Sequence, residues 1–215
     1  MFNLIDRTCW PRNQVFWYFS EAAPTGYSIT VEVDISKLLE TIKETEYRFF
    51  PSYLWAVTKN LMNHTEFCCA IKDGAVGYYD KLTPLYASFH EDNHTFSLMW
   101  TEYDSDFRTF HKRYMEDKKM YGNIKGILAK PGVPPENAYT VSAVPWVEFS
   151  HFAVHSYENK PYYFPSIEAG KYHEKDGKVL LPISLTCHHA TTDGWHIKCF
   201  LEELQKDFDN FEMYI

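Results

Sequence analysis

A long apolar stretch near the C-terminus predicts the strand around which the other elements are arranged. Apolar side chains occupy the odd positions from Val179 to Cys187, so in a strand they share one face. His189 has the same parity and ends this row, whereas His188 points to the opposite face. The run from 180 to 185 is almost continuously apolar, which is typical of a strand covered on both sides. The polar residues that follow suggest that the strand opens into a site.

Shorter patterns predict the other elements of one sheet-based domain. Helical spacing predicts helices over 13–19, 36–43, from Pro51 through 61, from about 105 to 121, and over 195–208, with Ser36 and either Asp104 or Ser105 as N-caps. Strands are expected over 27–34, 67–72, 76–79, 85–89, 95–100, 139–143, 147–155 and 166–172, and those between 67 and 100 read as an antiparallel meander. The connection 122–135 is the best candidate for a linker, but strands on both sides of it need a shared sheet. We therefore expect a single domain, 1–215.

Composition narrows the classes of partner. At 215 residues and 45% hydrophobic, the chain can build one substantial core, and an aromatic content of 18% favours large apolar pockets and interfaces. The net charge of −8 argues against nucleic acid and against an anionic membrane, since both bind basic surfaces. An anionic cofactor would need a local basic patch.

The N-terminus and the cysteines indicate a cytoplasmic protein. The first ten residues lack a basic start followed by an apolar run, and no stretch reaches the roughly 18 apolar residues of a membrane span. Five scattered cysteines are typical of free thiols in a reducing compartment.

The two adjacent histidines allow more than one chemistry. On a strand they face opposite ways, and the chain has neither Cys-x-x-Cys nor His-Glu-x-x-His, so we expect no metal. His189 at the rim of an apolar face can serve as a general base. For an arbitrary histidine, the favoured alternative is a core residue bonded to a backbone carbonyl, with Asp193 only capping the next helix.

The segment His188-His189-Ala190-Thr191-Thr192-Asp193-Gly194 resembles the active-site signature of the chloramphenicol acetyltransferase family. Other stretches match that family in order and in approximate spacing, so the resemblance covers nearly the whole chain. They are Pro24-Thr25-Gly26-Tyr27-Ser28, Thr95-Phe96-Ser97, Thr101-Glu102-Tyr103-Asp104-Ser105-Asp106-Phe107, Pro135-Glu136-Asn137, Val141-Ser142-Ala143-Val144-Pro145-Trp146-Val147-Glu148-Phe149 and Gly170-Lys171-Tyr172.

The resemblance implies an α/β (α+β) fold with a mixed, largely antiparallel sheet flanked by helices, and a homotrimer with sites at subunit interfaces. It also implies transfer of an acetyl group from acetyl-CoA to a hydroxyl, with chloramphenicol as the leading acceptor. His189 would take the hydroxyl proton during direct transfer, and the Ser142 hydroxyl would stabilise the oxyanion. Without the resemblance, Ser142 would be read as a hydroxyl bonded to a neighbouring strand or turn. No Gly-x-Ser-x-Gly elbow is present, which argues against a serine acyl-enzyme.

By the same resemblance, Asp193 and Gly194 are structural and hold the turn after the strand. Some relatives pair this aspartate with an arginine in the first helix. Residues 13–26 contain neither Arg nor Lys, and Arg12 is expected to be only a weak substitute.

The resemblance also assigns residues to the two substrates. Trp146 and Tyr172 would line the path of CoA, and Lys171 is a plausible neighbour of its phosphates. The acceptor pocket is expected to include five residues: Tyr27, Phe96, Tyr103, Val154 and Glu168. Two positions depart from the family pattern, Glu168 where Thr is usual and Thr140 where Asn is common.

Three alternatives stay open. The chain could acetylate another alcohol or an amine, or it could be a CoA-binding or assembly homologue without turnover. A lipoyl acyltransferase is conceivable from the His-x-x-x-Asp-Gly pattern, but the chain has no lipoyl domain or Ala/Pro linker, and His188 stands where that family has Asp.

Overall fold

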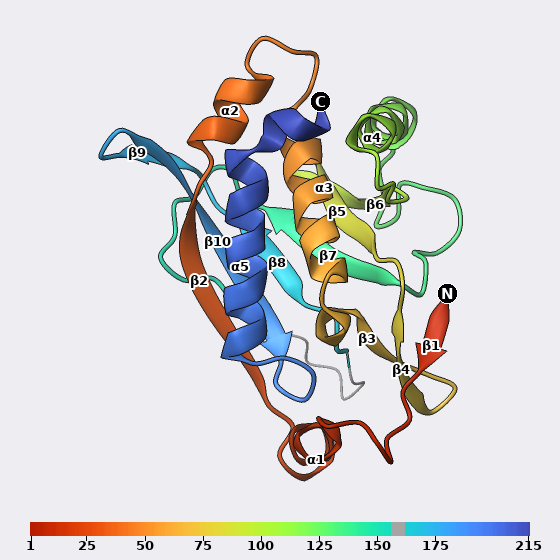
Figure 1. Ribbon diagram of the computed structural model, residues 1–215. Helices are drawn as coiled ribbons and strands as arrows, with labels where there is room; N and C mark the ends of the chain where they lie inside the picture. The colour runs from red at the N-terminus through yellow and green to blue at the C-terminus, as the bar shows by residue number, and fades with distance from the viewer. Residues whose placement is uncertain (156–161) are drawn as a thin grey trace.

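The structure is a computed structural model that describes residues 1–155 and 162–215, and a seven-stranded sheet is its central element (Figure 1). Six strands lie in the order β2 (Gly26–Asp34), β10 (Lys178–His188), β8 (Ser166–Ala169), β7 (Ala138–Ala143), β5 (Thr83–His90) and β6 (Thr95–Trp100), and β9 (His173–Lys175) pairs with β10. β7 is parallel to β5 and β8, and the other pairs are antiparallel. The predicted mixed, largely antiparallel sheet is confirmed.

Four helices cover one face of this sheet, which we call the inner face. They are α2 (Ser36–Ile42), α3 (Phe49–Met62), α4 (Phe107–Tyr121) and α5 (Gly194–Asp209), and Figure 1 shows α3 and α5 side by side over the strands. The apolar row predicted for β10 points into this layer: Leu181, Ile183 and Leu185 are fully buried in one cluster with Leu54 of α3 and Phe200 of α5. None of the helices in the described ranges is long and apolar enough to cross a membrane.

A smaller sheet corrects the predicted meander. β1 (Phe2–Leu4), β4 (Ala75–Tyr79) and β3 (Cys69–Lys72) form a separate three-stranded sheet, and the short helix η2 (Thr65–Cys68) directly precedes β3. The segment 67–100 therefore folds as two hairpins in two sheets, because β5 pairs with the distant β7 rather than with β4.

The N-terminal helix lies at the end of the large sheet where β10 finishes (Figure 1). α1 (Asn13–Trp17) runs directly into the π-helical turn η1 (Tyr18–Ala22), so the predicted helix 13–19 is present and extends further. At the other end of the chain, η3 (Phe211–Tyr214) follows α5.

Three local predictions were wrong. Residues 147–155 form no strand: this segment crosses the face of the large sheet opposite the helices, where the Phe152 amide donates to the Thr30 hydroxyl (3.4 Å). Asp106, not Asp104 or Ser105, caps α4 by accepting from Thr109 N (2.9 Å). Ser36 is not the N-cap of α2, since its hydroxyl instead accepts from Val179 N (2.8 Å).

Candidate active site

The face of the large sheet turned away from the helices, here called the outer face, carries two complete rows of polar residues. One row runs through Ser28, Thr186, Ser166 and Thr140, and the next through Thr30, Ser184, Glu168 and Ser142, each across β2, β10, β8 and β7. Hydrogen bonds join Ser28 to Thr186 (2.9 Å) and Thr30 to Ser184 (3.0 Å). The strict alternation of side chains in strands therefore separates an apolar inner face from a polar outer face.

Glu168 is the ionisable member of these two rows. It is 1% exposed, and the Ser166 hydroxyl donates to its Oε1 atom. Its Oε2 atom is buried and has no hydrogen-bond partner among the described residues. Burial raises the pKa of Glu168 to about 7, against the lowering effect of the Ser166 hydrogen bond. Ser142 lies beside Glu168 on the adjacent strand.

His189 lies in the turn directly after β10, with its orientation fixed at both ends. The His189 amide donates to Thr25 O (2.8 Å), and its Nδ1 lies 3.0 Å from Thr192 O. Because a carbonyl oxygen only accepts hydrogen bonds, Nδ1 carries the proton and Nε2 is left with a free lone pair. The carbonyl contact expected for a plain core histidine is thus present, but the ring is only half-buried.

Two aromatic rings hold this imidazole. Phe19 of η1 stacks on it, with ring centroids 4.1 Å apart and planes 28° apart, and Tyr27 of β2 meets it edge-on at 5.2 Å. Tyr27 was predicted to lie at the site, and its hydroxyl donates to Thr192 Oγ1 (3.2 Å). Phe19 was missed, since an aromatic residue at the end of a short helix gives no local signal of what it contacts.

Arg12 holds the same turn from the opposite side. Its guanidinium donates to Ala190 O (2.9 Å), to His189 O (3.2 Å) and to the Asp193 carboxylate (2.8 Å). The expectation that Arg12 is only a weak substitute was wrong, because Arg12 forms the ion pair with Asp193. It does so from the N-cap position of α1, one residue before the range 13–26 that contains neither Arg nor Lys.

Asp193 also begins α5. It is the N-cap residue and accepts from Trp195 N (3.0 Å). Partial burial acts to raise the pKa of Asp193, but Arg12 and His196 outweigh it, so this pKa lies below its ordinary value. Gly194, predicted to be structural here, is exposed, and a side chain at this position would meet nothing within 4 Å.

His189 and Ser142 are far apart within one chain. Ser142 lies level with Ser184, two strands away, whereas His189 lies five residues further along from Ser184. At about 3.3 Å per residue and about 4.8 Å between strands, their Cα atoms are roughly 19 Å apart. The two side chains of one copy therefore do not meet at one reacting atom.

The three residues predicted for CoA lie on neighbouring segments. The Lys171 amide donates to Val147 O (2.9 Å), which places Lys171 and Tyr172 next to the segment of Trp146. Trp146 is 61% exposed and Tyr172 is 46% exposed. Exposed aromatic faces beside a lysine are suited to an adenine ring and its phosphates.

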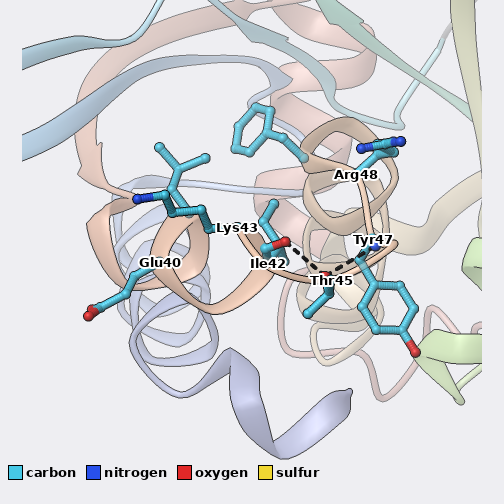
Figure 2. A pocket seen from close by; sticks show the side chains of 8 residues that line it. Glu40, Ile42, Lys43, Thr45, Tyr47 and Arg48 are labelled. Carbon is cyan, nitrogen blue, oxygen red and sulfur yellow. Dashed lines mark hydrogen bonds between the residues drawn. The ribbon is translucent and has the colours of Figure 1, made fainter.

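A pocket of about 570 Å³ lies close to this group, between α2 and α3 (Figure 2). Its member Phe49 packs against Tyr172, with ring centroids 5.9 Å apart. Figure 2 shows Lys43 and Arg48 on opposite sides of the pocket, and the acidic Glu40 also lines it.

The residues predicted for the acceptor pocket do not lie together in one copy. Phe96 is exposed on β6, at the sheet edge opposite the strand of Tyr27, and Val154 is exposed on the segment after Trp146. Tyr103 is buried in the main core, with its ring 6.0 Å from that of Phe110 in α4, so we do not retain it as a pocket residue. Within the described ranges, no group of three or more His, Cys, Asp or Glu side chains is arranged to hold a metal.

Comparisons with known proteins agree with this geometry. The family model described as chloramphenicol acetyltransferase matches residues 1–205. A chloramphenicol acetyltransferase of Clostridium perfringens is 38% identical over 215 residues, covering 100% of this chain and 98% of that protein. A solved structure of a chloramphenicol acetyltransferase has a TM-score of 0.84 at 26% identity, covering 97% of this chain and 99% of that one. The catalytic core of a 2-oxoacid dehydrogenase complex from Thermoplasma acidophilum has a TM-score of 0.65 at 15% identity, covering 93% of this chain and 95% of that one, a likeness of fold alone.

Proposed function

The chain belongs to the chloramphenicol acetyltransferase family, and from this premise we propose that it transfers an acetyl group from acetyl-CoA to a hydroxyl of chloramphenicol. The protein is an acyltransferase that inactivates the antibiotic by acetylating it. The observation that carries the mechanism is the fixed tautomer of His189, whose protonated Nδ1 faces Thr192 O and leaves Nε2 as a base.

The general base acts on the acceptor. A neutral alcohol is a weak nucleophile, and Nε2 of His189 takes its proton as the oxygen attacks the thioester carbonyl. Phe19 and Tyr27 keep the ring in place, and Arg12 and Asp193 hold the turn that carries it. When the intermediate collapses, His189 gives the proton to the leaving thiolate. Because the acceptor oxygen attacks the thioester directly, no acyl-enzyme forms.

The oxyanion needs a donor, and we assign this role to the Ser142 hydroxyl. One donor aimed at a developing oxyanion is worth roughly 3 kcal/mol in other enzymes. Because Ser142 and His189 of one copy are roughly 19 Å apart, they act in one reaction only when Ser142 belongs to a neighbouring copy.

We propose that the assembly is a homotrimer. A contact that joins the His189 turn of one copy to the outer face of the next is head-to-tail, and such contacts form a closed ring when the rotation between copies closes. A ring of three has three equivalent sites at its subunit contacts, as the family resemblance implies. The exposed acceptor residues Phe96 and Val154 would then meet Tyr27 across a contact.

Acetyl-CoA is the proposed co-substrate and supplies the acetyl group as a thioester. Trp146 and Tyr172 would bind its adenine, and Lys171, with Arg48 and Lys43 of the adjacent pocket, its phosphates. All five cysteines are free, which agrees with a proposed cytoplasmic location.

Thiol release from acetyl-CoA tests the proposal. We expect release that depends on chloramphenicol in the natural protein, and a loss of about 10²–10⁴-fold in His189→Ala. His94→Asn is the matched control, because His94 is an exposed histidine in the turn between β5 and β6.

Other outcomes separate the alternatives. Release only with another alcohol or an amine would replace chloramphenicol as the acceptor. Binding of CoA without release under any of these conditions would contradict the enzymatic proposal and favour a binding or assembly homologue.

A further inference from the structure

Glu168 is buried in a way that the proposed roles of His189 and Ser142 do not explain. Among the ion pairs between described residues, none includes Glu168. Ser166 satisfies Oε1, and the buried Oε2 has no hydrogen-bond partner within 1–155 and 162–215. An unsatisfied buried polar atom costs about 1–3 kcal/mol, and more if it is charged, so such an atom in a native site calls for a functional explanation.

The protonation state decides what this carboxyl can do. An ionised carboxylate only accepts hydrogen bonds, whereas the neutral acid has one O–H donor. Beside a developing oxyanion, the ionised carboxylate would repel the negative charge, whereas the neutral acid would stabilise it. A carboxylic acid kept neutral by an apolar site can serve as an oxyanion donor.

The register brings this carboxyl to the oxyanion donor already assigned. Ser142 and Glu168 are directly paired on parallel strands, about 4.8 Å apart, and both belong to the outer face. A ligand oxygen bonded to the Ser142 hydroxyl therefore lies within reach of Glu168, directly or through one water.

We propose that Glu168 is a further catalytic residue, a neutral carboxylic acid that donates a hydrogen bond, together with Ser142, to the oxygen on which negative charge develops. The proton stays on Glu168 throughout, so no bond is broken at this residue. The inference rests on the proposed function.

The surroundings increase the share of the neutral form relative to an exposed glutamate. Burial raises the pKa of Glu168 to about 7, so the acid form predominates below pH 7 and the carboxylate above it. The titratable groups linked electrostatically to it are Tyr53 of α3 and Cys187 of β10, and burial raises the pKa of both. On β7 the facing residue is Ser142, and on β10 it is Ser184, neither of which titrates here. The segment 147–155, which crosses the same face and accepts from Ser184 at Phe152 O, adds the carboxylate of Glu148 and the imidazoles of His151 and His155.

A pair of substitutions tests the donor. Glu168→Gln keeps an N–H donor without a titrating group, and Glu168→Leu removes the donor at similar size. With chloramphenicol at pH 6, we expect kcat of Glu168→Gln within a few-fold of the natural protein, and kcat of Glu168→Leu lower by about 10²–10³-fold. At pH 8.5 the natural protein should have lost activity through ionisation, and Glu168→Gln should exceed it by about tenfold or more.

Two results would overturn the proposal: a ratio of the natural protein to Glu168→Gln that does not change with pH, or equal activity of Glu168→Leu and Glu168→Gln at pH 6. A readout without turnover keeps this separate from the proposed function. In infrared difference spectra of the substrate-free protein, a carboxylic acid band should titrate near pH 7 and be missing in Glu168→Gln. If that band titrates but chloramphenicol is not acetylated, the proposed function fails and the donor role falls with it. If acetylation occurs and the band is absent, the inference alone fails.

Discussion

The two faces of the large sheet both contain fully buried side chains, yet they are built from different residues. Along β10, Leu181, Ile183 and Leu185 point to the helices and are 0% exposed, whereas Ser184 points to the outer face and is also 0% exposed. Burial alone therefore does not separate the faces. The inner face removes apolar area from water, which drives folding, and the outer face buries hydroxyls and one carboxyl, which does not.

A buried polar row is tolerated when its members bond to one another. Ser28 with Thr186 and Thr30 with Ser184 satisfy each other on the outer face, so these pairs cost little. Oε2 of Glu168, next to Ser142, is buried without a hydrogen-bond partner among the described residues. The comparison teaches that the fold depends on the inner face, and that the two polar rows of the outer face keep an uncompensated group, Oε2 of Glu168, where the proposed chemistry occurs.

The largest expected effect concerns the inner face. Ile183→Ala removes a fully buried side chain from the main core and should lower the free energy of unfolding by about 2–5 kcal/mol. Urea unfolding measures this loss, and kcat at a temperature where the variant is folded should stay within a few-fold of the natural value. A large loss of kcat with little loss of stability would mean that the inner face is not merely structural.

Ser142→Ala makes the converse test on the outer face. We expect kcat to fall by about 10²–10³-fold, while the free energy of unfolding changes by less than about 1 kcal/mol. Thr140→Val is the matched control, two residues away on the same strand and face, and should reduce kcat by less than tenfold. Equal losses in the two variants would show that the outer face acts as a whole and not through Ser142.

The division between the faces could be predicted from the sequence, because alternation in a strand is local. The apolar odd positions of β10 predicted part of the core, and the polar residues after the strand predicted His189 and Asp193 as residues of the site. The pairing of β5 with β7 left no local signal, since it joins segments more than 50 residues apart. For the same reason, the predicted meander contained only pairs of strands that are neighbours in the sequence.

Parts of the candidate site were also beyond the sequence. Phe19 stacks on His189 from 170 residues away, and an aromatic side chain does not reveal its partner. Tyr103 lies in a stretch that matches the family, but its own direction depends on where α4 packs. Arg12 was underrated because a cation just before a helix looks exposed until the turn after β10 packs against it.

The turn that carries His189 sharpens the comparison, because the Arg12 guanidinium holds it by three hydrogen bonds in addition to its aromatic contacts. Arg12→Ala removes three hydrogen bonds, including a charged one, and should lower the free energy of unfolding by about 1.5–3 kcal/mol and reduce kcat. Arg12→Lys keeps the positive charge but not the several N–H donors of the guanidinium, so it should recover only part of the stability and part of kcat. Lys37→Ala breaks an exposed pair with Glu40 and should cost less than about 0.5 kcal/mol. Urea unfolding and kcat measure these effects. If Arg12→Ala lost no more stability and no more kcat than Lys37→Ala, the role of Arg12 in holding the turn would be contradicted.

The smallest expected effect is a pH-dependent one at the far side of the same turn. Glu66, 3.7 Å from Nε2 of His196, raises the pKa of His196 against the effect of burial, and Asp193 adds to this. A raised folded-state pKa means stabilisation that is complete below the unfolded value of 6.5 and is lost as the pH rises through the higher folded value. His196→Gln should therefore cost up to about 1 kcal/mol at pH 5.5 and almost nothing at pH 9. Glu66→Gln should remove the same pH-dependent part, since Glu66, with its pKa lowered mainly by His196, stays ionised over this range. Unfolding curves of the natural protein and His196→Gln at a series of pH values measure the difference directly. A difference that stays constant with pH would mean that His196 supports the turn by packing, as an inner-face residue does, and not by its charge.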